Sequence, residues 1–154
     1  MSTKAESADL ILKLYDLRRE KKMRKARKWI MDFAPKTAAD YSEAVMDPKT
    51  GPYLRMVTSY WEMAAALVNQ DCIDPEVFNA SNGEHFVVFA KIEPILAELR
   101  QKYDRPTLFS NLEQTIANAP GGPERLRKTQ EFLQGLAARR AEAEKDEEEK
   151  SASA

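Results

Sequence analysis

The sequence predicts an all-α protein, an irregular bundle of six to seven helices with a long N-terminal helix. Three observations predict this class: the 154 residues include only 5 glycines, apolar residues recur with helical spacing, and no stretch alternates apolar and polar residues as a strand does. The length suits one domain with a single core. We expect the domain to span residues 1–140 and residues 141–154 to form an acidic tail, disordered or frayed because it has nothing to bury.

The first predicted helix runs from about Ala5 to Ala34, because the residue before Pro35 avoids the helical region. One apolar face continues down the whole helix, and an extra stripe lies on the other side. A helix that is apolar on two sides needs partners on two sides. Either a later helix of the same chain covers the stripe, or the helix packs on its symmetry mate in a homodimer. The stripe consists of Leu10, Leu14 and Leu17.

Residues 37–70 predict two helices. Thr37 is the expected N-cap of a short helix that ends near Met46. A proline- and glycine-containing turn over residues 47–52 separates it from a helix over about 53–70. The apolar residues of that second helix recur at the helical period, so we expect it to be the central core helix.

The second half of the chain predicts four more helices. Asp74 is the expected N-cap of a short helix over 75–80, with Pro75 at its first position. The spacing of Ser81 and Glu84 is that of a capping box opening a helix over 84–103, with a kink expected at Pro94. Two last helices are expected over about 107–118 and 123–140, separated by a proline- and glycine-rich break.

Several kinds of chemistry are disfavoured by what the sequence lacks. With one cysteine, Cys72, and one histidine, His85, the chain has too few ligands for the usual structural zinc sites and no internal disulfide. It contains no phosphate-cradling glycine motif and no nucleophile elbow. We therefore expect no cofactor and no metal. No apolar run is long enough for a membrane span and no signal segment opens the chain, so we expect a cytoplasmic protein.

A basic run lies in the first predicted helix, and charge is segregated along the chain. Residues 18–28 carry a net charge of +7, whereas residues 29–123 carry −6 and the tail carries −4. Three interpretations compete: a solvated helix face, a surface that pairs with acidic residues of the same or another subunit, and a binding site for nucleic acid or another polyanion. A total charge of −1 counts against a dedicated nucleic-acid domain. The cations are Arg18, Arg19, Lys21, Lys22, Arg24, Lys25, Arg27 and Lys28.

Glu62 and His85 are the weaker candidates for a small-ligand pocket or an enzyme site. Glu62 points away from the apolar stripe of the predicted core helix, so a solvated role is the simpler interpretation. His85 stands on an apolar stripe near a helix start, which favours a hydrogen-bonded structural histidine. A ligand site would require a cavity reached by one of the two, and a closed core there would exclude it.

Four segments together resemble a family of small bacterial all-helical proteins of the domain-of-unknown-function kind. The segments are Leu14–Glu20, Arg27–Trp29, Tyr60–Ala66 and Ser81–Glu84, and the likeness covers about residues 8–119. The resemblance implies a bacterial cytoplasmic protein and carries no activity, cofactor or catalytic residue.

The favoured function is a non-enzymatic protein-interaction or homodimerisation module, with the first helix as the main contact. Weak binding of nucleic acid or another polyanion by the basic run is the alternative, and a ligand pocket or enzyme near Glu62 and His85 is the third hypothesis. No membrane contact is expected.

Overall fold

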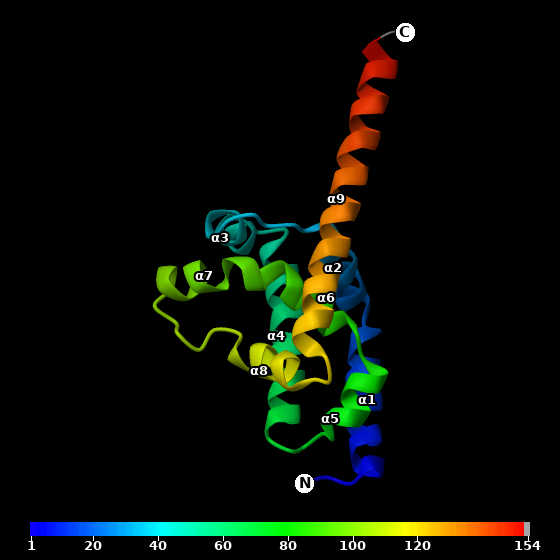
Figure 1. The fold of residues 1–154 in the computed structure, drawn as a ribbon, viewed down its shortest axis with the longest axis vertical. Helices are drawn as coiled ribbons and strands as arrows, with labels where there is room; N and C mark the ends of the chain where they lie inside the picture. Colours follow the sequence, from blue (N-terminus) through cyan, green and yellow to red (C-terminus); the bar gives the residue numbers. More distant parts are fainter. Residues whose placement is uncertain (153–154) are drawn as a thin grey trace.

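The computed structural model describes residues 1–152, and they fold into the predicted all-α architecture, without a strand in that range (Figure 1). None of the helices in the described part is both long and apolar enough to cross a bilayer. The elements are α1 (Lys4–Arg18), α2 (Lys21–Asp32), α3 (Ala38–Met46), α4 (Gly51–Asn69), α5 (Pro75–Ser81), α6 (Glu84–Ile92), the 3-10 turn η1 (Glu93–Ile95), α7 (Leu96–Lys102), α8 (Ser110–Asn118) and α9 (Gly122–Ala152).

The predicted long N-terminal helix is wrong, because it is divided at Glu20. The Glu20 backbone is not helical (φ −57°, ψ 141°) and its carboxylate accepts a hydrogen bond from the Met23 N–H at 2.9 Å, so it acts as the N-cap of α2. The preceding turn closes α1 with the Arg19 N–H donating to the Asp16 carbonyl. With α6, η1 and α7 taken as one bent helix, this division gives eight helices in residues 1–152, more than the six or seven predicted.

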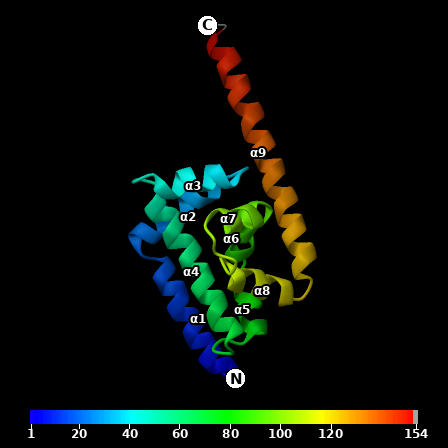
Figure 2. The ribbon, with the colours of Figure 1, turned by 90° about the vertical axis from the view of Figure 1, so that its left-hand side faces the viewer.

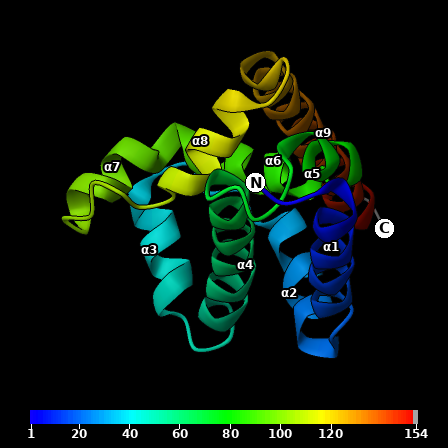
Figure 3. The same cartoon turned by 90° about the horizontal axis from the view of Figure 1, so that it is seen from below.

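The predicted core helix is α4, and it lies at the centre of the bundle. Figure 3 shows α4 between α3 on one side and α1 and α2 on the other, and α2, α3 and α8 pack directly on it. Its side chains Leu54, Val57, Trp61 and Ala64 have 1% exposure or less. Apolar burial of this extent is the main stabilising contribution to the bundle.

Most local signals in the sequence act as predicted, and one does not. Thr37 and Asp74 cap α3 and α5 through their side chains, and the chain bends at Pro94, where η1 separates α6 from α7. The capping box of Ser81 and Glu84 does not form: Gly83 is the N-cap of α6 and makes no side-chain cap. Glu84 instead turns toward α2 and α4.

The last helix, α9, packs on α6 and α8 and then projects far beyond the rest of the molecule (Figure 2). Leu136 is its last half-buried residue, and residues 137–152 are all exposed. That segment is about 24 Å long at 1.5 Å per residue. Residues 141–152 of the predicted tail thus continue α9, residues 153–154 lie outside the described residues, and fraying of the tail in solution stays a prediction.

Candidate interaction surface

Six of the eight cations of the basic run are exposed, in α2 and in the turn before it, and we call this set the basic face. All six are exposed, and the structure of residues 1–152 gives none of them an ion-pair partner. The basic face consists of Arg19, Lys21, Lys22, Arg24, Lys25 and Lys28.

The helical period of α2 separates this surface from the core. Met23, Ala26 and Ile30 recur at three- and four-residue spacing, are buried, and pack toward α4. Lys21, Arg24, Lys25 and Lys28 recur at the same spacing on the opposite side. When the apolar side of α2 packs on the core, the helical period therefore places these four cations on the solvent side.

The other two cations of the run, Arg18 and Arg27, are half-buried and contact groups of other helices. The Arg18 guanidinium lies over the rings of Tyr15 and Trp61, 5.2 and 5.3 Å from their centroids. The Arg27 Nε donates to both carboxylate oxygens of Glu84, at 3.0 and 2.9 Å. That all eight cations form one polyanion contact stays a prediction; the six exposed ones are those without an ion-pair or ring partner in residues 1–152.

Glu84 joins α2, α4 and α6. Its side chain is only 10% exposed, and it also accepts a hydrogen bond from the Trp61 indole N–H at 3.2 Å. The hydrogen bonds and charge of Glu84 raise the pKa of Arg27. Charge-assisted, bidentate pairing of this kind fixes orientation as well as contributing energy, so α2 is held rigidly with its basic face outward.

The C-terminal end of α2 is anchored by another cation. The Lys91 ammonium of α6 donates to the carbonyl oxygens of Met31 at 3.1 Å and Phe33 at 2.7 Å, where the helix carbonyls are otherwise without partners. Burial lowers the pKa of Lys91. Trp29 stacks on Phe33 with ring centroids 4.8 Å apart, so its ring serves the core rather than the surface.

Like charges one turn apart destabilise a helix. On α2 the pairs Lys21 and Lys25, Arg24 and Lys28, Lys21 and Arg24, and Lys25 and Lys28 have this spacing, and each costs about 0.2–0.5 kcal/mol. A solvated face gains nothing from such repulsion. An anionic partner would relieve it, which makes the basic face the strongest candidate site on the molecule.

The predicted dimer stripe on the first helix is mostly covered by the same chain. Leu14 is 7% exposed and its carbonyl accepts a hydrogen bond from the Tyr60 hydroxyl at 2.6 Å. Leu10 packs half-buried against the core. Only Leu17, at 56% exposure, is open to a partner.

Glu62 and His85 serve separate parts of the structure. The Glu62 carboxylate accepts hydrogen bonds from the N–H groups of Asn111 and Leu112, both at 3.0 Å, and so caps α8 from α4. It also reaches a cavity of about 490 Å³. His85 is completely buried and does not contribute to the lining of this cavity.

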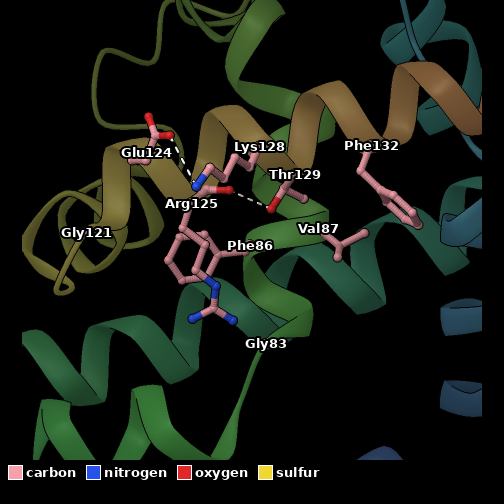
Figure 4. Close-up of a pocket in the computed structure, with 9 residues that line it drawn as sticks. All are labelled: Gly83, Phe86, Val87, Gly121, Glu124, Arg125, Lys128, Thr129 and Phe132. Atoms are coloured by element: carbon pink, nitrogen blue, oxygen red, sulfur yellow. Dashed lines mark hydrogen bonds and ion pairs between the residues drawn. The ribbon is translucent and has the colours of Figure 1, made fainter.

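A shallow groove of about 560 Å³ follows the contact between α6 and α9 (Figure 4). Its cations already have partners: the Arg125 guanidinium lies 4.1 Å from the Phe86 ring centroid, and Lys128 pairs with Glu124 at 3.5 Å. Phe132 is exposed beside them. The groove is the contact that docks α9.

Glu62 was a candidate pocket residue in the sequence, but neither the partner of Arg27 nor the other residues that line the cavity could be predicted from it. Arg27 and Glu84 are 57 residues apart, and the residues lining the cavity come from α3, α4 and the α7–α8 loop. A pairing over this distance leaves no local pattern. The eight-to-one excess of cations in residues 18–28 was the signal for the basic face.

Comparison with known proteins yields one family. The family described as "Domain of unknown function (DUF4760)" matches residues 3–118, which covers α1 to α8, including the basic face, and ends before α9. No curated protein and no solved structure matches the chain.

Proposed function

We propose that this chain, which belongs to the DUF4760 family, is a non-enzymatic interaction module that self-associates through its basic face. The contact is made with the acidic end of α9, residues 141–152, from a second copy. The observation that carries the proposal is a row of six exposed cations without ion-pair partners in residues 1–152 of a chain whose total charge is −1.

The acidic end of α9 supplies the complementary charge. It holds six acidic residues and two lysines, a net charge of −4, and all its residues from 141 to 152 are exposed. Arg140 pairs with Asp32 at 2.7 Å, so α9 passes the C-terminal end of α2 and then leaves the molecule (Figures 1 and 2). A straight α9 therefore presents its acidic end to another molecule.

Each copy carries both surfaces, so a two-fold dimer would make the contact twice. Exposed ion pairs contribute about 0.2–1 kcal/mol each and are screened by salt. Association of this kind is modest, rises at low ionic strength and depends on the number of pairs rather than on any single one.

The first test is sedimentation of the full chain at low and at physiological salt. We expect a larger mass at low salt, and at least tenfold weaker association for Arg24→Glu with Lys25→Glu, because reversing two charges turns attraction into repulsion. The matched control is Lys49→Glu with Lys102→Glu, two exposed cations outside the basic face. A monomer at low salt, or equal losses in both variants, would refute the proposal.

Binding of nucleic acid is the second candidate, favoured by the turn-by-turn spacing of cations along α2. Anisotropy of labelled duplex DNA and single-stranded RNA tests it at the same two salt concentrations. Micromolar binding that falls steeply with salt and is lost in Arg24→Glu with Lys25→Glu would support this candidate. Absence of binding at low salt would remove it and leave self-association.

A further inference from the structure

The cavity beside Glu62 is the second feature of the molecule that has the properties of a binding site, and it is independent of the basic face. Its volume of about 490 Å³ lies in the range of small-ligand sites. The residues that line it come from α3, α4 and the loop of residues 103–109. That loop joins α7 to α8 (Figures 1 and 3).

The walls of the cavity are apolar and fixed before any ligand arrives. Tyr41 and Phe109 are buried and meet edge to face with ring centroids 6.5 Å apart. The Arg100 Nε donates to the Leu108 carbonyl at 3.1 Å, and the hydroxyls of Tyr103 and Ser42 lie 2.7 Å apart. The loop is thus held near both of its ends, as preorganised sites require.

Phe109 is held in an unfavourable backbone conformation at this wall. Its φ is +57°, in the left-handed region that costs an aromatic residue conformational energy. The Phe109 side chain is buried, packs against Tyr41 and lines the cavity. The three hydrogen bonds that Glu62 accepts from α8 hold the following turn in place.

The charged groups lining the cavity determine the class of ligand. Arg55 donates to the Val45 carbonyl at 3.1 Å, Arg105 has no side-chain hydrogen bond or ion pair in the described part of the chain, and both arginines are exposed. Glu62, the one acid in the lining, is already engaged by α8. Two guanidinium groups beside an apolar cavity suit an organic anion with an apolar body.

We infer that this cavity binds a small organic anion, its apolar body against Tyr41 and Phe109 and its carboxylate or sulfonate at Arg55 and Arg105. The inference concerns binding only and does not depend on self-association.

The test uses anilinonaphthalene sulfonate, an apolar anion whose fluorescence rises on binding, with octanoate as competitor. We expect saturable binding to the folded chain that octanoate displaces. Arg55→Gln with Arg105→Gln is expected to weaken binding at least tenfold, because both charge-assisted contacts are lost. Ser59→Phe, at an exposed position of the lining, is expected to fill the cavity and abolish binding.

Two controls distinguish this cavity from other apolar or basic surfaces. Phe132→Ser with Lys128→Gln changes the α6–α9 groove, and Lys25→Gln with Lys28→Gln removes two cations from the basic face. Both variants are expected to bind the probe with unchanged affinity. Unaltered binding in both cavity variants, or octanoate-induced amide shifts confined to α6 and α9, would overturn the inference.

Discussion

His85 makes the stability of this protein depend on pH in a way that one substitution can test. Its ring is completely buried, 4.8 Å from the Phe86 centroid and 5.1 Å from that of Phe78. Neither ring nitrogen has a hydrogen-bond partner in the described structure. Burial, with a smaller effect of the nearby charge of Arg125, lowers the pKa of His85 from 6.5 to about 3.

Whether a lower pH stabilises or destabilises the fold depends on whether the folded or the unfolded chain binds the His85 proton more readily. In the unfolded chain His85 takes up a proton below about pH 6.5, whereas the folded chain holds it neutral down to about pH 3. The stability that it contributes is therefore complete above pH 6.5 and falls as the pH is lowered toward 3. Between about pH 7.5 and pH 5 the loss from this group is about 2 kcal/mol, at 1.36 kcal/mol per pH unit below the unfolded pKa.

The measurement is urea unfolding of the wild type and His85→Phe at both pH values. Phenylalanine preserves the aromatic packing and removes the titrating ring, while the carboxylates common to both proteins change alike. We expect the free energy of unfolding of the wild type to fall by about 2 kcal/mol more than that of the variant. Equal falls in the two proteins would refute the reasoning that His85 is buried in its neutral form.

Three further predictions test individual contacts. Glu84→Gln is expected to lower the free energy of unfolding by about 2 kcal/mol, because it removes the charge-assisted pair with Arg27. Glu76→Gln, at an exposed ion pair, is expected to change it by less than about 1 kcal/mol. Urea unfolding of the two variants makes the comparison. Glu62→Ala removes the cap of α8 and is expected to cost about 1–2 kcal/mol, seen as faster amide exchange in the first turn of α8; unchanged exchange there would contradict the capping role. Leu14→Glu places a charge in the core and is expected to unfold the chain, whereas Leu17→Glu changes stability by less than about 0.5 kcal/mol; loss of self-association in Leu17→Glu, measured by sedimentation, would make the first helix the contact instead.

The parts of the fold that were predicted are those governed by neighbouring residues. Thr37 and Asp74 bond to backbone N–H groups three residues away, and Pro94 disturbs only its own turn. The apolar period of α4 also lies within one helix. Such signals are contained in a few consecutive residues, so the sequence reports them directly.

The features that were missed depend on residues far apart in the chain. Residues 18–28 consist of good helix formers, which favour one continuous helix by propensity alone. The Glu20 cap coincides with the packing of Arg18 over Trp61, 43 positions later. Likewise, Leu14 is covered by a helix that includes Tyr60. Tertiary contacts of this kind override local preference, and a single sequence carries no record of them.

For the basic face too, features within one helix could be predicted and contacts between helices could not. The excess of cations that forms the basic face could be counted in the sequence, and the helical period placed four of them on one side. The sequence does not show that Arg18 and Arg27 lie apart from that surface, because their partners Trp61 and Glu84 belong to other helices. Of the eight cations counted in the sequence, the structure therefore places six in the basic face.

A charge exchange between two variants tests the central proposal most directly. One variant carries Arg24→Glu with Lys25→Glu, and the other carries Glu147→Lys with Glu148→Lys in the acidic end of α9. Each alone is expected to sediment as a monomer at low salt, and their equimolar mixture is expected to restore the dimer, because both contacts of the pair again join opposite charges. A mixture that stays monomeric while the wild type dimerises would contradict the pairing of the basic face with the acidic end of α9.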